Sequence, residues 1–318
     1  MKSNSGLYVL NAGVFSQLQD LGRYGQAKQG LSQGGVGDPL AAGWANYLLK
    51  NSADKSLIEI SFGQAEFIAE CDLQLAITGA EMSAFIVMPS GQKKAQSNNR
   101  SFVLKKGQGL KFGFASSGVR AYLAVKGGFN IRKKYGSCST VTRNFIGGLD
   151  GTGSNLKNGD RLSAFEQLDR LITTKIPEQF IPDYNSPLTL GVIEAYQCEY
   201  FSSRQKAMFY NIEYTIGTQS DRMGLRLTGK SIGGLSKGII SEGIALGSIQ
   251  IPADGLPIIL LQDRQTLGGY PKIGCVARCD LNLLVQKSAG EKIRFKPTCL
   301  ADQQQRYLQR LRFFNQFK

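Results

Sequence analysis

The chain has 318 residues, of which 42% are hydrophobic and 19% charged, and its 38 glycines against 9 prolines favour a turn-rich β fold over a disordered chain or a helical bundle. The net charge of +14 is dispersed, which favours an anionic small molecule or an acidic protein partner over nucleic acid. The absence of histidine excludes Ser-His-Asp and Cys-His catalysis and His-ligated metals, so any chemistry must rely on carboxylates, Lys, Arg, Tyr, hydroxyl groups and backbone N–H groups.

A helix and a series of short strands are predicted along the chain. Asp38 is a suitable N-cap and Pro39 suits the first helical position, so a helix should run from there to about Asn51. A second helix is predicted over 301–317, to dock on the body of the protein or on a partner. Short apolar or alternating runs predict strands at 57–60, 73–77, 85–88, 102–104, 121–125 and 256–261.

Internal similarity predicts two related β units. The sequence CDLQL at 71–75 returns as CDLNL at 279–283, and KGQGLKF at 106–112 resembles AGEKIRF at 289–295. A weaker parallel links the segment at 20–25 to that at 221–226. The boundary should lie in the proline-punctuated stretch from Thr173 to Pro187. We therefore expect an N-terminal domain over 1–180, a C-terminal domain over 186–300 and an amphipathic helix over 301–318.

The termini and cysteines indicate a cytoplasmic protein. The first residues lack the pattern of a signal peptide, and no run approaches the about 18 apolar residues of a membrane span. The six cysteines are scattered, which is typical of reduced, buried thiols. Cys275 and Cys279 are four residues apart, but no second Cys pair or histidine could complete a zinc site, and we expect no metal site.

Two catalytic patterns occur out of context. Residues 224–231 match the P-loop pattern GxxxxGK[ST]. However, an alternating run lies between its two glycines, and Ser231 is followed by Ile-Gly-Gly rather than by a helical pattern. The sequence therefore favours a strand and a turn there. The SxxK spacing at 52–55 and at 90–93 falls in predicted turns and lacks partner motifs, so coincidence is the better interpretation.

Three clusters mix Arg, Asp and Gln with glycines. They cover 19–38, 220–252 and 262–274, and the last follows the most apolar run of the chain, Leu256–Leu261. A glycine pair such as Gly268 and Gly269 is usually needed for close backbone approach or a positive φ. Such clusters can aim guanidinium and N–H groups at an oxyanion. They can equally be tight turns with structural Asp–Arg pairs, and the residue types leave both interpretations open.

The motifs of these clusters resemble a known family. They are QDLGRYG at 19–25, GSCST at 136–140, DRMG at 221–224, SEG at 241–243, SIQIP at 248–252, DG at 254–255 and DRQTLGGYP at 263–271. Together they resemble the biotin-dependent carboxyltransferase, or allophanate hydrolase subunit 2, family, including its branch of KipA-like C subunits of 5-oxoprolinase. The resemblance runs from about residue 10 to residue 297. Gln33, Gly37 and the tail beyond Pro297 depart from it.

The resemblance implies a fold and a function. The fold would be mainly β, with two cyclophilin-like β-barrel domains and a few short helices. The reaction would be ATP-dependent opening of 5-oxoproline to L-glutamate, carried out with a KipI-like (allophanate hydrolase subunit 1 type) subunit and a third, LamB/YcsF-type subunit. ATP with Mg²⁺ would act in the complex, and no biotin would be attached to this chain. Two alternatives stay open: a carboxyltransferase-type subunit acting on a biotin- or urea-derived substrate, and a non-catalytic KipA-like regulator of a histidine kinase.

The resemblance also implies site residues. Guanidinium groups would clamp a carboxylate or phosphate, backbone N–H groups at 248–250 and 268–269 would face the developing oxyanion, an aspartate would position water or metal, and a tyrosine would donate a hydrogen bond. The expected catalytic residues are Asp254, Asp263, Arg264 and Tyr270. The expected substrate-binding residues are Arg23, Asp221, Arg222, Ser248, Gln250, Gly268 and Gly269.

Overall fold

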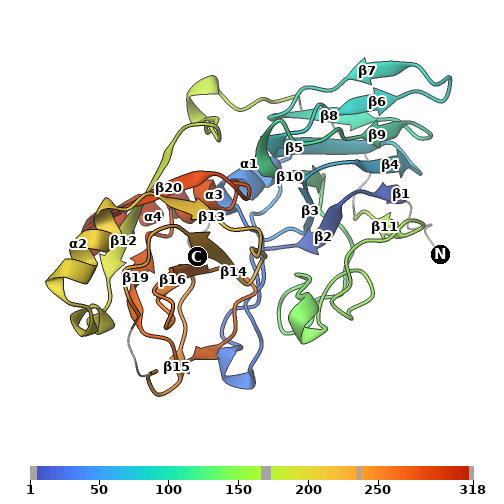
Figure 1. Cartoon of the computed structure of the whole chain (residues 1–318). Helices are drawn as coiled ribbons and strands as arrows, with labels where there is room; N and C mark the ends of the chain where they lie inside the picture. The colour runs from blue at the N-terminus through green and yellow to red at the C-terminus, as the bar shows by residue number, and fades with distance from the viewer. Residues whose placement is uncertain (1–5, 166–172, 235–237, 315–318) are drawn as a thin grey trace.

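The chain folds into two β units that lie side by side and are joined by helices and loops. The computed structural model describes residues 6–165, 173–234 and 238–314. In Figure 1 the N-terminal unit runs from blue to green and the C-terminal unit from yellow to red. The mainly β class with a few short helices, predicted from the sequence, is confirmed. None of the helices in the described ranges is long and apolar enough to cross a membrane.

Two antiparallel sheets form the N-terminal unit and enclose its core. The aromatic rings of Phe67 and Phe112 meet edge to face in this core, with centroids 6.3 Å apart. The first sheet has the order β11 (Arg161–Ser163), β1 (Gly6–Ala12), β4 (Ala65–Ala69), β9 (Gly109–Lys111), β6 (Phe85–Val87) and β7 (Lys93–Ala95). The second has the order β2 (Phe15–Gln19), β3 (Leu57–Ser61), β10 (Ser117–Val125), β5 (Leu73–Glu81) and β8 (Arg100–Leu104).

A closed barrel forms the C-terminal unit. Phe209 stacks on Phe295 inside its core, with centroids 4.5 Å apart. The strand order is β12 (Leu188–Glu194), β19 (Lys272–Val276), β16 (Ser248–Gln250), β17 (Ile258–Leu260), β14 (Gly224–Thr228), β13 (Tyr214–Ile216) and β20 (Lys292–Pro297). A separate two-stranded ribbon pairs β15 (Glu242–Gly243) with β18 (Leu267–Gly268). Each unit thus has its own apolar core.

Two of the helices begin at residues whose side chains cap them. The Asp38 carboxylate accepts the N–H groups of Leu40 and Ala41 at 3.0 Å each, and α1 (Pro39–Leu48) follows it. The predicted helix at this position is therefore confirmed, although it ends three residues before Asn51. Not predicted were α2 (Ser203–Asn211), whose capping box consists of Ser202 and Gln205, and the short α3 (Leu281–Leu284). The tail helix, α4, covers Leu300–Phe313, and residues 315–318 lie outside the described ranges.

The internal similarity corresponds to similar structure in only part of its length. The first CDLQL copy begins β5, whereas its CDLNL counterpart forms the helix α3. The second pair does match, because both copies lead into strands, β9 and β20. The aspartate pair also matches: Asp20 Oδ1 accepts Gly22 N–H at 2.9 Å, and Asp221 Oδ1 accepts Met223 N–H at 2.7 Å. The short apolar repeat of CDLxL therefore did not determine secondary structure by itself.

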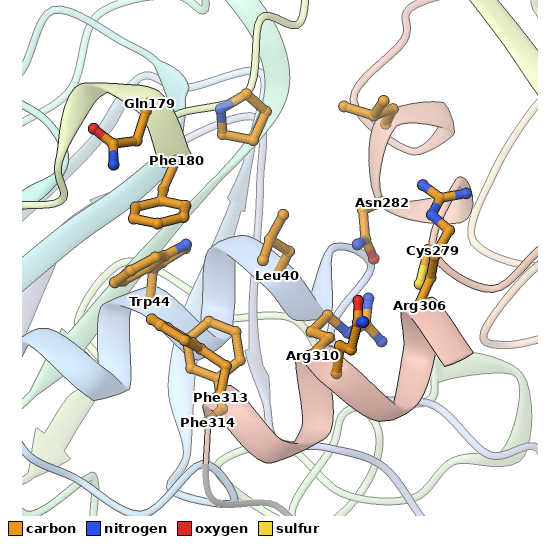
Figure 2. A pocket seen from close by; sticks show the side chains of 13 residues that line it. Leu40, Trp44, Gln179, Phe180, Cys279, Asn282, Arg306, Arg310, Phe313 and Phe314 are labelled. Atoms are coloured by element: carbon orange, nitrogen blue, oxygen red, sulfur yellow. The ribbon is translucent and has the colours of Figure 1, made fainter. Parts of the chain in front are cut away.

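Helix α4 packs against the N-terminal unit through aromatic side chains at its C-terminal end. Figure 2 shows Phe313 and Phe314 of α4 beside Trp44 of α1. The ring centroids lie 5.1 and 5.4 Å from that of Trp44. Gly43 of α1 allows this contact, because a Cβ there would already be 3.3 Å from the Phe314 ring. The tail helix thus docks on the body of the protein, one of the two outcomes expected from the sequence.

A buried ion-pair network joins the two β units. Arg222 donates from Nη1 to Glu59 of the N-terminal unit at 2.6 Å, and from Nε and Nη2 to Asp263 of its own unit at 3.0 Å each. Nη2 also donates to the carbonyl of Gly35 at 2.6 Å. All three charged side chains are nearly fully buried. Such a network is costly to break, because removal of one partner leaves the other charges without a counterion inside the protein.

We expect Arg222→Ala to destabilise the protein strongly. The change leaves the Asp263 carboxylate buried without its counterion and leaves Glu59 paired with Arg120 at 3.7 Å, which should lower the free energy of unfolding by about 3–5 kcal/mol. Chemical denaturation followed by circular dichroism measures the difference. The matched control is Arg226→Ala on strand β14, which begins two residues after Arg222, because that side chain is exposed. Equal stability of the two variants would show that the network contributes nothing to the junction.

Candidate functional site

The β15–β18 ribbon brings together motifs that are far apart in the sequence. Glu242 of the SEG motif pairs with Gly268 of the GGYP motif across this ribbon. In Figure 1 β15 lies at the lower edge of the barrel. Gln250 of β16 is the register partner of Lys272 on β19, so the two lie on adjacent strands of the barrel wall. The polar side chains of these strands and of the ribbon form one cluster.

A lysine–glutamate pair lies at the centre of this cluster. Nζ of Lys272 is 2.5 Å from Oε1 of Glu242, and the lysine side chain is only 7% exposed whereas that of glutamate is 34% exposed. Gln197 donates from Nε2 to Glu242 Oε1 at 2.9 Å and accepts the backbone N–H of Lys272 at 2.9 Å. The hydroxyl of Tyr196 donates to Glu242 Oε2. The cluster therefore opens to solvent on the side of Glu242 and Tyr196.

Hydrogen bonds within this cluster favour the ionised form of Glu242. Lys272 and then Tyr196 lower the pKa of the Glu242 carboxyl by donating hydrogen bonds to it. The same contact with Glu242 raises the pKa of the Tyr196 hydroxyl. Near neutral pH the cluster thus presents an ionised Glu242 carboxylate beside a protonated Tyr196 phenol.

Gln250 supplies a further donor. Its side chain is 1% exposed, and its Nε2 atom has no hydrogen-bond partner among the described residues. A Cβ at Gly268 would lie 3.0 Å from this Nε2 atom, so a side chain at this position would press against the buried amide. A buried amide N–H without a partner costs free energy, which a bound acceptor would recover.

The glycine pair serves close backbone approach. A Cβ at Gly269 would lie 2.9 Å from the carbonyl oxygen of Ile239 and 3.3 Å from Oγ of Ser241, and neither glycine has a positive φ. Ile239 N–H donates to the Gly269 carbonyl at 2.9 Å, which holds the two segments together. Of the two reasons that the sequence allowed for these glycines, close approach is the one that the structure shows.

The cluster can bind and polarise a carbonyl compound. The side chain of Lys272 and the unpaired amide N–H of Gln250 can stabilise an oxygen that gains negative charge. The Glu242 carboxylate beside them can accept a proton. The structure places Gly268, Gln250 and Tyr270 of the expected set at or next to this cluster. Tyr270 is half exposed and lies two residues before Lys272. Their roles remain predictions.

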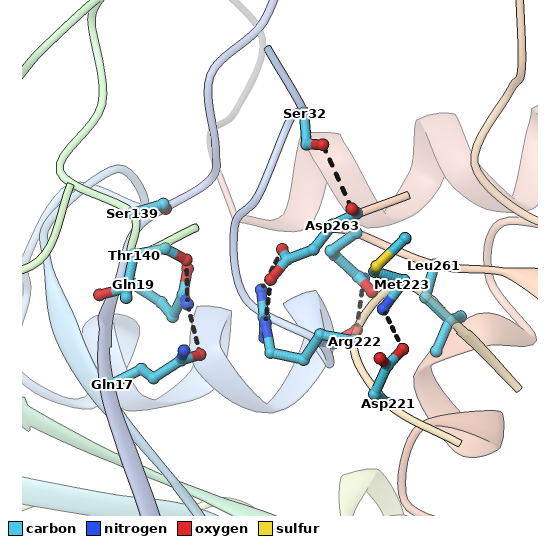
Figure 3. A network of polar contacts seen from close by, with 12 residues as sticks. Gln17, Gln19, Ser32, Ser139, Thr140, Asp221, Arg222, Met223, Leu261 and Asp263 are labelled. Atoms are coloured by element: carbon cyan, nitrogen blue, oxygen red, sulfur yellow. Dashed lines mark hydrogen bonds and ion pairs between the residues drawn. The ribbon is translucent and has the colours of Figure 1, made fainter. Parts of the chain in front are cut away.

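Arg222 and Asp263 lie outside this cluster. Figure 3 shows the two side chains facing each other, with Asp221 holding the adjacent turn through Met223 N–H. The Arg222 guanidinium is surrounded by protein, since it also binds Glu59 and the Gly35 carbonyl. Desolvation opposes the charge on Arg222, but the two carboxylates outweigh it and raise its pKa. These contacts support a structural role at the junction of the units.

The other expected residues are dispersed. Arg23 and Arg264 line a small groove between the units. Asp254 is exposed in a turn, where its Oδ1 accepts Leu256 N–H at 3.0 Å. The backbone N–H of Ser248 donates to the Ala245 carbonyl at 3.2 Å. The structure therefore divides the expected set among a polar cluster, a structural ion pair, a groove and surface turns.

The cluster contains four residues that lie outside the set expected from the sequence, namely Tyr196, Gln197, Glu242 and Lys272. The sequence does hold a signal for Lys272, which stands between Pro271 and Ile273 at the start of an apolar strand. An exposed lysine is unexpected at such a position. Glu242 lies inside a motif that was recognised but was not assigned a role. Gln197 had no signal, because only the fold brings its 3₁₀ turn (Tyr196–Tyr200) against β19.

We expect Gly269→Ala to disturb this cluster. The added methyl group meets backbone at Ile239, so the 239–241 segment must move, at a cost of about 1–3 kcal/mol in the free energy of unfolding. Chemical denaturation curves measure this change in the free energy of unfolding. The control is Gly243→Ala in the same ribbon, where a Cβ meets nothing within 4 Å and the stability should change by less than about 0.5 kcal/mol. A loss as large in the control would remove close approach as the explanation.

Comparison with known proteins places the chain in a family. Residues 29–297 match the family model described as the carboxyltransferase domain, subdomain A and B. The 5-oxoprolinase C subunit of Escherichia coli is 32% identical over 96% of this chain and 97% of its own length, and that of Haemophilus influenzae is 34% identical over 92% of each. The crystal structure of the Kluyveromyces lactis urea carboxylase covers 99% of this chain with 29% of its own, at a TM-score of 0.87 and 23% identity, a likeness in fold. The chain belongs to the carboxyltransferase domain family.

Proposed function

We propose that this chain is the C subunit of an ATP-dependent 5-oxoprolinase, which opens 5-oxoproline to L-glutamate. The observation that carries the proposal is the similarity to two proteins named as the C subunit of 5-oxoprolinase, which extends over more than nine-tenths of both partners. The resemblance found in the sequence supports the same reaction. We expect the chain to act in a complex with a KipI-like subunit and a LamB/YcsF-type subunit, in the cytoplasm.

The polar cluster is the proposed place where the lactam binds. The carbonyl oxygen of the lactam would accept hydrogen bonds from Lys272 and from the amide of Gln250, whose Nε2 atom has no partner among the described residues. Negative charge that develops on this oxygen during ring opening would be stabilised by the same two donors. Glu242, which is ionised and partly exposed, would take a proton from the attacking water. Tyr270 at the edge would donate to the substrate.

This chain's own residues do not fit a nucleotide and its metal. Among the described residues no group of three or more His, Cys, Asp or Glu side chains could hold a metal ion. The P-loop pattern at 224–231 forms strand β14 and a turn, as the sequence favoured, and no helix begins at its Lys-Ser pair. ATP with Mg²⁺ is therefore proposed for the complex, and no step through it is assigned to this chain.

The proposal predicts that Lys272→Met abolishes most of the activity. Loss of the ammonium group removes a donor to the developing oxyanion, which should lower 5-oxoproline-dependent ATP hydrolysis by the reconstituted subunits by about a hundredfold or more. The matched control is Lys292→Met, because Lys292 forms an exposed pair with Glu213 at 2.7 Å on the same barrel. A Lys272→Met variant with the wild-type rate would exclude this cluster as the reaction site.

The same assay tests Tyr270→Phe at the edge of the cluster and Arg264→Ala, whose expected catalytic role would have to act from the separate groove. A rate equal to that of the wild type for either variant would remove that residue from the expected catalytic set. Calorimetric titration with free biotin and with 5-oxoproline separates the proposal from a carboxyltransferase-type function, because the two functions favour different ligands. Binding of biotin without binding of 5-oxoproline, together with no 5-oxoproline-dependent turnover in the complex, would contradict the proposal.

A further inference from the structure

A groove at the junction of the two units and α4 has a basic lining. One part of it, of about 230 Å³, is lined by Arg278 and Arg310 together with apolar side chains. The adjoining part, of about 90 Å³, is lined by Arg23 and Arg264. Tyr24 and Gln33 line both parts, so the two adjoin. The described residues that line the groove include four arginines and no carboxylate.

Several of these guanidinium groups have N–H groups to spare. Nε of Arg278, Nη1 of Arg310 and Nη1 of Arg23 are buried and have no hydrogen-bond partner among the described residues. Arg278 donates from Nη2 to the Tyr24 hydroxyl at 3.2 Å. Arg23 uses its other nitrogens for the carbonyls of Lys134, Ser137 and Ser139. A buried charged donor without a partner is costly, which makes each of these groups ready for an acceptor.

Two of the arginines contact the same aromatic ring. The guanidinium carbons of Arg278 and Arg310 lie 5.3 and 5.0 Å from the centroid of the Tyr307 ring. Figure 2 shows Arg310 on α4, on the side of the helix that faces α1. The stacking on Tyr307 restrains the two planar groups and leaves their edges for hydrogen bonds.

The carboxylates near the groove are already engaged by other groups, as Asp20 beside Arg23 is by Ser137 and Ser139. Burial, and the neighbouring charge of Arg278, lower the pKa of Arg264 to about 10. Asp263 also acts on Arg264, but its carboxylate is held by Arg222. Arg310 acts on the buried Asp38, whose oxygens already accept from Tyr184, Gln286 and the first turn of α1. A bound anion would relieve the repulsion between the arginines.

We propose that this groove is a binding site for a small organic anion that carries a carboxylate or phosphate group, held by the edges of Arg278 and Arg310. The volume exceeds that of a bare inorganic ion, and apolar side chains such as Leu246 and Leu311 line the rest of it. The site is distinct from the cluster around Lys272. It goes beyond the proposed reaction and does not depend on it.

Helix α4 contributes lining residues of the proposed site that lie outside the family match. Tyr307 and Arg310 belong to α4, which lies beyond residue 297, where the match to the family model ends. The part of the groove that α4 contributes thus lies outside the residues that the family model matches. The choice of anion would therefore depend on this helix.

Titration calorimetry on the full chain, with inorganic phosphate and with acetate at constant ionic strength, tests the proposal. The wild type should bind one of the two probes, and the probe that binds identifies the group. Arg310→Gln and Arg278→Gln should each weaken that binding about tenfold or more, because each removes a charge-assisted donor. Arg226→Gln, which removes an exposed charge from β14, should leave it unchanged.

Two further variants keep the outcome decisive. Lys272→Met should bind the probe as the wild type does, which separates this site from the proposed reaction site. Arg310→Lys retains the charge but loses the planar donor edge, so its binding should fall although its fold is preserved. No binding of either probe by the folded wild type, or full binding by both Arg→Gln variants, would overturn the proposal. Loss of binding in Lys272→Met with full binding in Arg310→Gln would move the anion to the other site.

Discussion

The arrangement of the two units depends on the buried guanidinium of Arg222. It satisfies Glu59 of one unit and Asp263 of the other, and it also fixes the Gly35 carbonyl in the loop before α1. Ion pairs of this kind contribute little net stability compared with apolar packing, but they tolerate only one geometry. The relative position of the units, and with it the groove between them, is thereby set. Ser32 supports the same loop by donating to the Arg264 carbonyl at 2.7 Å.

The polar cluster around Lys272 is built on the outside of a barrel whose interior is apolar. Ile249 is fully buried in the core, so its neighbour Gln250 points away from it, as alternation along a strand requires. The β15–β18 ribbon covers these outward side chains and brings Glu242 to them. Gly268 and Gly269 let the ribbon lie close enough for this. Because the polar groups lie under a covering ribbon, the barrel keeps an apolar interior beside them.

Local sequence signals predicted helix α1 and many of the strands. Asp38 and Pro39 predicted the start of α1, and the short apolar runs predicted strands, because capping and alternation act within a few residues. The resemblance supplied the family, but not the division of labour among its motif residues. Arg222 and Arg264 look equivalent in sequence, yet one is bound by carboxylates and a carbonyl, whereas the other lines a groove. That difference, like the contact of Gln197 with Lys272, depends on long-range packing and is not encoded near either residue.

The contact between Phe314 and α1 has a consequence for how the protein is made. The apolar cluster beneath α1 contains Trp44 and Tyr122 of the N-terminal unit, and it is completed by Phe314. During synthesis on the ribosome, the N-terminal unit is complete before Phe314 is made. Part of the apolar cluster beneath α1 therefore stays exposed until the C-terminal barrel and α4 have emerged. A nascent chain in that state exposes an apolar surface of the kind that chaperones recognise. The docking of α4 thus acts as a late step of maturation for a unit built from the first half of the chain.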